Sequence, residues 1–280
     1  MNITATHALT APLRDLAAWV DHFSRTDIPV LADTAETLEA LRLNEDAVDA
    51  NNLGEMISGD PLMTLKVLAH AATHRSRRIV TDTETVIATL VMMGISPFFR
   101  AFGPQPTVQQ QLAGEPAALA GLLEVVARAH RSARFALGFA VHRMDHDAAV
   151  IHEAALLHDF AEMLLWCHAP ALAARILDAQ CADPTLRSAA AQKQVLGIEL
   201  PDLQQALMKA WHLPDLLIRI SDDRHVENPS VRNVVLAVRL ARHTASGWGN
   251  AAVPDDIDDV ARLLNLSHAA TLALVQDIDR

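Results

Sequence analysis

The chain has 280 residues, of which 51% are hydrophobic and 20% are charged, with 10 glycines and 13 prolines. This composition excludes a disordered chain and suffices for one large domain or two fused halves. The net charge of −11 disfavours non-specific nucleic-acid binding, which needs a positive surface. Only the cluster Arg75, Arg77 and Arg78 is a candidate for a phosphate contact, and it is otherwise a solvated face. Aromatic residues are 4% and alanine and leucine outnumber the β-branched residues, which favours an all-α fold.

The first half of the chain predicts a leading amphipathic helix over 13–23 and several short helices after it. Asp60 and Pro61 form a helix start, because the carboxylate can cap free amides and proline lacks only an amide that the first turn does not use. Thr81 and Glu84 resemble a capping box for a helix that ends at Gly94. The predicted helices cover 35–43, 48–57, 61–72 and 86–94, and the segment 103–106 marks an internal boundary.

The second half predicts a helical hairpin followed by shorter helices that start at prolines. One helix runs over 116–144 and the next over 148–168, with the pair His158 and Asp159 in the middle of the second. No segment alternates apolar and polar residues as a half-buried strand does. The remaining helices are predicted over 183–197, 201–211, 214–224, 229–245, 257–264 and 268–278, the last capped by Ser267.

The sequence shows no membrane, secretory or disulfide signal. No apolar run approaches the length that crosses a bilayer, and the N-terminus lacks the order of a signal peptide, so we expect a cytoplasmic protein. Cys167 and Cys181 are the only cysteines and fit neither a disulfide framework nor a thiolate zinc site, so we interpret them as core residues.

Two groups of side chains are candidates for metal chemistry. His158 and Asp159 lie in apolar surroundings, where an acid must be paired, hydrogen-bonded or metal-bound, and a structural hydrogen-bonded pair is the favoured interpretation. The second group could share a divalent ion or form a polar turn, and it comprises His142, Asp145, His146 and Asp147. Gly-rich phosphate loops, GxSxG elbows and HExxH motifs do not occur.

Several weak motifs in register identify a family. The segment 28–31 resembles the entry motif of the HDOD proteins, bacterial signalling domains related to the HD phosphohydrolases, and 56–68 is similar to their "IS-x-DP-x-L-x-x-x-VL" helix. The segment 86–94 is similar to their "AI-x-x-LG" helix. In the second half, His130, 155–159 and 211–214 follow in the expected order, so the resemblance covers about residues 28–278.

The resemblance implies a fold and a test of the metal site. We expect an N-terminal extension (1–27), a bundle of about five helices (28–106) and an HD-like helical domain (107–280) packed on it. His130, His158 and Asp159 match metal-coordinating positions of HD enzymes. Two further ligand positions are lost, because Leu200 and Val238 stand there and neither side chain can coordinate. His225 matches one member of a later histidine pair, and without any tyrosine the Gly-Tyr-Pro motif of cyclic-di-GMP-cleaving relatives is absent.

These features predict a non-catalytic regulatory module that binds a signalling partner or a small effector and needs no cofactor. The alternative is a metal-dependent phosphohydrolase acting on nucleotides, with His130, His158 and Asp159 as ligands and His225 or Asp222 added. Family-motif residues with an expected structural role are Asp60, Pro61, Gly94, Trp211 and Pro214. Trp211 is favoured as a core anchor over a ligand platform, and Phe98, Phe99 and Phe102 are expected between the two halves.

Overall fold

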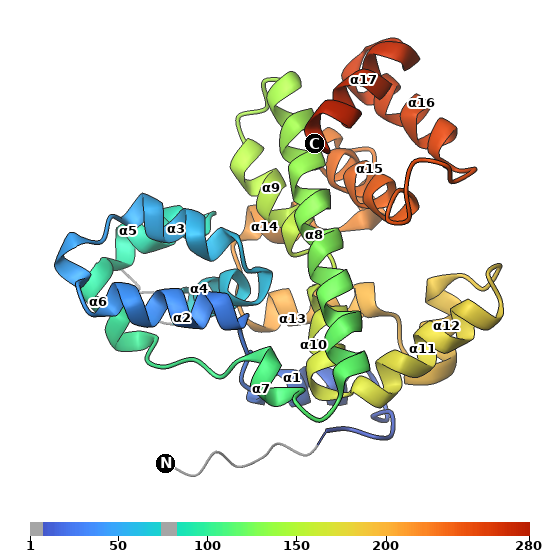
Figure 1. Ribbon diagram of the computed structural model, residues 1–280. Helices are drawn as coiled ribbons and strands as arrows, with labels where there is room; N and C mark the ends of the chain where they lie inside the picture. The colour runs from blue at the N-terminus through green and yellow to red at the C-terminus, as the bar shows by residue number, and fades with distance from the viewer. Residues whose placement is uncertain (1–7, 74–82) are drawn as a thin grey trace.

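The computed structural model describes residues 8–73 and 83–280, and its regular structure there is helical (Figure 1). These two ranges contain no β-strand, and one isolated parallel bridge joins Val30 and Thr107. The expected all-α class is confirmed. Thr81, Arg75, Arg77 and Arg78 lie outside the described residues. The first helices are α1 (Leu16–Arg25), α2 (Ala32–Arg42), η1 (Glu45–Ala47), α3 (Ala50–Ser58), α4 (Pro61–Thr73), α5 (Val86–Met93), α6 (Ile95–Ala101) and α7 (Val108–Gln111).

The second half is built around one long helix. In Figure 1, α8 (Pro116–His142) runs through the molecule, and α9 and α15 pack along it. The helices that follow α8 are α9 (Ala148–Leu156), α10 (Phe160–His168), α11 (Pro170–Ala182), α12 (Ser188–Leu196), α13 (Leu200–Ala210), α14 (Asp215–Ile220), η2 (Asp223–His225), α15 (Pro229–His243), α16 (Val253–Leu264) and α17 (His268–Ile278).

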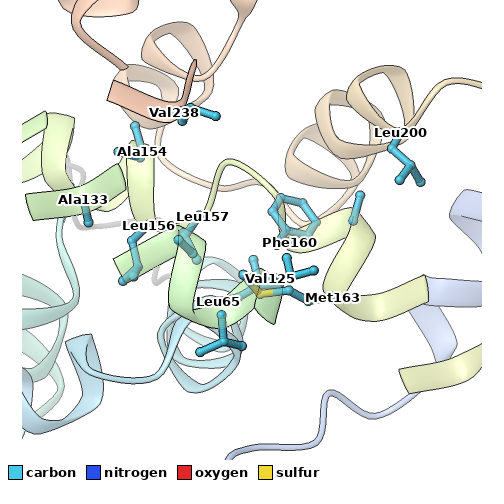
Figure 2. Close-up of a cluster of buried hydrophobic side chains, with 14 of the residues drawn as sticks. Leu65, Val125, Ala133, Ala154, Leu156, Leu157, Phe160, Met163, Leu200 and Val238 are labelled. Carbon is cyan, nitrogen blue, oxygen red and sulfur yellow. The ribbon is translucent and has the colours of Figure 1, made fainter. Parts of the chain in front are cut away.

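Buried hydrophobic side chains form two clusters that share α4. The larger cluster fills the space between α8 and the later helices, and Figure 2 shows part of it, including Leu65 and Phe160. The smaller cluster joins α2, α3, α5 and α6. Residues 62, 65 and 68 of α4 belong to the larger cluster, whereas Met63 and Val67 belong to the smaller one. The two faces of this one helix therefore connect both clusters.

Asp60 starts α4 as the Asp-Pro motif predicts. Its Oδ1 accepts hydrogen bonds from the amides of Leu62 (2.9 Å) and Met63 (3.1 Å), which have no partner inside the helix. Its Oδ2 accepts from the amide of Leu31 at 2.8 Å, so the same carboxylate holds the entry motif against α4. The side chain is fully buried, and burial raises the pKa of Asp60 despite these hydrogen bonds.

The expected position of the three phenylalanines is wrong. Phe98, Phe99 and Phe102 are buried in the smaller cluster and not between the two halves. Arg42 of α2 donates to the backbone oxygens of Phe99 and Phe102 and places its guanidinium 5.3 Å from the Phe99 ring centroid. Arg42 therefore connects α2 to the end of α6 and to the residue that follows it.

Helix α1 packs with the second half of the chain. Trp19 and Phe23 stack at 5.8 Å between ring centroids and are buried in the larger cluster. The indole of Trp19 donates to the backbone oxygen of Leu196 at 3.4 Å. Part of the segment expected as an N-terminal extension therefore belongs to the core of the second half.

The single helix predicted over 148–168 is wrong, because α9 ends at Leu156 and α10 begins at Phe160. His158 and Asp159 lie in the break, where the side chains meet partners from distant helices. Sequence analysis also missed α11, which begins at Pro170.

The other three family-motif residues, Gly94, Trp211 and Pro214, lie at helix ends or in the core. Gly94 lies at φ 81°, a conformation that favours glycine, and separates α5 from α6. Trp211 is buried with its ring centroid 5.8 Å from that of Phe160, and Pro214 directly precedes α14.

Within the described ranges, no single helix has the length and apolar character to cross a membrane. By length and composition only, the segments Ala148–His168 and Pro170–Ala182 could do so together as a pair bent by 117°.

Candidate functional site

A cavity of about 600 Å³ lies at the break between α9 and α10. The cavity is bounded by α8, α10, α11, α12, α13 and α15 and by the segment 221–224, and His158 and Asp159 contribute to its wall. This volume is in the range of small-molecule sites. Trp166 forms part of another wall and packs so closely on α8 that a Cβ at Gly121 would lie 2.6 Å from a carbon of its ring.

His158 is held between two carboxylates. Its Nδ1 lies 2.9 Å from Asp159 Oδ1, and its Nε2 lies 3.0 Å from Asp223 Oδ2. Burial lowers the pKa of His158, but the hydrogen bonds to the two carboxylates outweigh burial and raise it to about 9. The ring is therefore protonated at neutral pH and donates a hydrogen bond from each nitrogen.

Asp159 is the centre of an ion network. Oδ1 accepts from Arg242 at 2.6 Å in addition to His158, and Oδ2 accepts from Arg128 Nε at 3.0 Å. Arg128 also donates to Glu162 at 2.7 Å. Burial favours the neutral form of Asp159, but Arg242, His158 and Arg128 hold its pKa well below the usual value.

The donor set does not fit the metal centre that the HD relationship implies. A histidine ligand must be neutral and offer a lone pair, whereas both nitrogens of His158 contact carboxylates. Both oxygens of Asp159 accept from guanidinium groups. An ion at this position would have to displace Arg128 and Arg242, whose positive charges repel it.

His130 does not join this pair. Among the described residues, no three His, Cys, Asp or Glu side chains are grouped to hold a metal ion, so the positions that the resemblance matched to metal ligands, His130, His158 and Asp159, do not form a metal site. The ring of His130 hydrogen-bonds the backbone of Gly59, and burial lowers its pKa. The α8 residue that reaches Asp159 is Arg128.

Of the two positions expected to have lost a metal ligand, one lines the cavity and the other lies in the hydrophobic core. Leu200 lines the cavity and presents an apolar side chain to it. Val238 is buried in the larger cluster close to Ala154 (Figure 2). The α15 residue in the cavity wall is Arg242, one helical turn after Val238.

His225 lies outside the site, whereas its neighbours line it. The side chain of His225 is 63% exposed and contacts Glu227 at 3.1 Å. Asp222, Asp223 and Arg224 line the cavity, and Arg224 pairs with Asp222 at 2.7 Å.

Arg128, Arg242 and Asp223 were not among the site residues predicted from the sequence. The two arginines could have been predicted from helical spacing, because Arg128 follows buried Val125 by three residues and Arg242 follows buried Val238 by four, which puts each arginine on the buried face of its helix. A charged residue on the buried face of a helix needs a partner.

The remaining candidates do not form sites. His142, Asp145, His146 and Asp147 are not grouped to hold a metal in the described part of the chain, and Asp145 pairs with Arg143 at 3.3 Å. The interpretation as a polar turn is favoured. Cys167 is buried and Cys181 is exposed, and neither is in a disulfide, so only Cys167 is the expected core residue.

Comparisons with solved structures find the same fold in other proteins. The response regulator MmoQ from Methylococcus capsulatus superposes with a TM-score of 0.63 at 16% identity, over 90% of this chain and 98% of that one. A virulence factor from Campylobacter jejuni superposes with a TM-score of 0.60 at 18% identity, over 95% and 92% of the two chains. At such identities the likeness concerns the fold.

Curated proteins give no sequence match. The profile of the HDOD domain matches residues 28–226, which are most of the chain. This match confirms the resemblance of the sequence motifs: the chain belongs to the HDOD family.

Proposed function

We propose that this chain is a non-catalytic regulatory module of signal transduction that binds a small effector or a protein partner. One observation carries the proposal: the guanidinium groups of Arg128 and Arg242 bind both oxygens of the Asp159 carboxylate. In an HD hydrolase this carboxylate would coordinate the metal, whereas here it binds Arg128, Arg242 and His158 in an ion network. The same network closes one wall of a cavity that has the volume of an effector site.

The known proteins agree with such a role. The resemblance to the HDOD proteins implies a signalling role, and one of the superposed structures is named a response regulator. Because the site lies between helices of one hydrophobic cluster, an effector bound there would contact α8, α10, α13 and α15 together. Such an effector could change the packing of these helices and so a surface that a partner recognises.

The test is metal content combined with hydrolysis. The full chain is equilibrated with Mn²⁺ and with Zn²⁺ and desalted, and bound metal is measured by elemental analysis. Nucleotide hydrolysis is then assayed for the natural chain and for His158→Ala. We expect far less than one metal per chain and no hydrolysis that the variant removes.

A stoichiometric metal together with hydrolysis that His158→Ala abolishes would refute the proposal and support the phosphohydrolase. His268→Ala is the matched control, because His268 on α17 contacts Asp258 at 2.6 Å and lies outside the cavity.

A further inference from the structure

The cavity has one apolar wall and one acidic wall. The apolar wall comes from α10 and α11 and includes the buried residues Leu165, Trp166 and Ile176. The acidic wall comes from Glu124 of α8, the start of α10, the start of α13 and the segment 221–224. A ligand that fills both parts needs an apolar body and a polar head.

The charge of the wall is negative after its ion pairs are counted. Among the described residues that line the cavity, seven are carboxylates and three are arginines. Each arginine already pairs with a carboxylate: Arg128 and Arg242 with Asp159, and Arg224 with Asp222. Even with His158 protonated, negative charges remain in excess. An anionic ligand such as a phosphate ester is therefore disfavoured.

Two exposed carboxylates of the cavity lining have no cationic side chain at ion-pair distance in the described part of the chain: Glu124 on α8 and Asp202 on α13. Other acids of the wall have cationic partners, as Glu199 has in Lys193 at 2.5 Å. Glu124 can therefore bind a positive ligand without giving up a partner. Asp202 gives up no ion-pair contact, because Lys193 and Arg224 attract it only from farther away.

Two buried polar atoms of the wall also lack a partner. Gln205 Oε1 and Ser221 Oγ make no hydrogen bond, although their residues are only 7% and 4% exposed. The amide nitrogen of Gln205 donates to the backbone oxygen of Ser221 at 2.8 Å, which fixes the amide and leaves Oε1 as an acceptor. A buried acceptor without a donor is costly, and a ligand that donates hydrogen bonds would remove this cost.

We propose that the cavity binds a small organic cation, an ammonium or guanidinium group carrying an apolar body. The cationic head would lie near the carboxylates and donate to Gln205 and Ser221 once these two buried side chains turn towards it, and the body would pack on Trp166. The proposal rests on the proposed effector function and specifies its ligand class. A bare metal ion does not satisfy it, because the apolar wall would stay empty.

The experiment compares three probes of similar shape and different charge: 2-phenylethylamine, 2-phenylethanol and phenylacetate. Binding to the full chain is measured by isothermal titration calorimetry, with tryptophan fluorescence as a second readout because Trp166 lines the cavity. We expect the amine to bind at least tenfold more tightly than the alcohol and the acid to bind more weakly than both. Equal binding of amine and alcohol, tighter binding of the acid, or no binding of the amine at millimolar concentration would overturn the proposal.

Variants locate the binding. Glu124→Gln and Asp202→Asn change exposed residues and should each weaken amine binding about threefold to tenfold without changing alcohol binding. Glu55→Gln on α3 removes the same charge outside the cavity and should leave amine binding unchanged. An equal loss in all three variants would mean non-specific attraction to an acidic chain and would overturn the proposal.

Failure of this ligand class is distinguishable from failure of the proposed function. If the anion binds best, the cavity is an effector site of another class and the regulatory proposal stands. If metal-dependent hydrolysis is found, the regulatory proposal fails whatever the three probes do.

Discussion

At the scale of single residues, Asp159 neutralises three cationic side chains: Arg128, Arg242 and protonated His158. Removing one partner of a buried ion network leaves its other members without compensation. Asp159→Asn should therefore lower the free energy of unfolding by about 3 kcal/mol. This value is at the low end of the losses seen when a buried ion pair is broken, because the side chain of Arg242 is 44% exposed and water can solvate it. Urea denaturation measures the change.

The control for this prediction is Asp223→Asn. Asp223 also contacts His158, but its side chain is 40% exposed, so water can replace the lost contact. The expected loss is below about 1 kcal/mol. Equal losses in the two variants would contradict the central role of Asp159.

The ionisation of His158 gives a second prediction. Its pKa in the folded state is about 9, above the usual 6.5, so folding favours the protonated ring. This stabilisation is present in full below pH 6.5 and is lost as the pH rises through about 9. NMR of ¹³C-labelled histidine should show one ring that titrates near 9 and disappears in His158→Gln. Titration of that ring below 7 would contradict the hydrogen-bond geometry.

At the scale of elements, Asp60 connects the start of α4 to the entry motif. Asp60→Ala removes the acceptor of Leu31, Leu62 and Met63 and should cost about 3 kcal/mol of unfolding free energy, because buried amides lose their partner. Asp49→Ala at the exposed start of α3 removes a cap of the same type and should cost only about 1 kcal/mol.

Asp60→Asn sharpens the test, since it keeps one acceptor oxygen and presents an NH₂ group in place of the other. It should retain the cap of α4 and lose the bond to Leu31, with an intermediate loss of stability. Chemical denaturation of the three variants separates the two contributions. A loss in Asp60→Ala no larger than in Asp49→Ala would show that the connection to Leu31 contributes nothing.

Helix starts that depend on local chemistry were predictable from sequence. Asp60 caps α4, and Ser267 accepts from the Ala270 amide at the start of α17, as its position suggests. The break between α9 and α10 was not predictable, because apolar residues recur at helical spacing on both sides of it. Its side chains are held by Arg128, Asp223 and Arg242, which only the tertiary structure brings there.

At the scale of the whole molecule, the sequence predicts only those residues of the candidate site that are unusual in their own local segment. His158 and Asp159 could be found because a charged pair stands in an apolar run. The matching arginines lie 31 and 83 residues away from Asp159, and sequence spacing alone cannot place them against it. The family motif favoured His130, whereas the helix face that contains Val125 and Arg128 is the one that meets Asp159.

Glu153 joins the two hydrophobic clusters by one hydrogen bond. It belongs to α9 in the second half, and its Oε1 accepts from the amide of Val86, the first residue of α5, at 2.6 Å. The side chain is 3% exposed, and Oε2 has no hydrogen-bond partner. Burial raises the pKa of Glu153 to about 8, although the Val86 amide acts in the opposite direction.

A raised carboxyl pKa makes this junction sensitive to pH. The unfolded chain loses the Glu153 proton near pH 4.5 and the folded chain near 8, so stability falls as the pH rises between these values. Glu153→Gln keeps an acceptor for Val86 and cannot ionise, so its unfolding free energy relative to the natural chain should increase from pH 5 to pH 8. Glu55→Gln, an exposed control, should show a difference that does not vary with pH. A Glu153→Gln difference that is flat or falls over this range would mean that Glu153 is already charged in the folded protein.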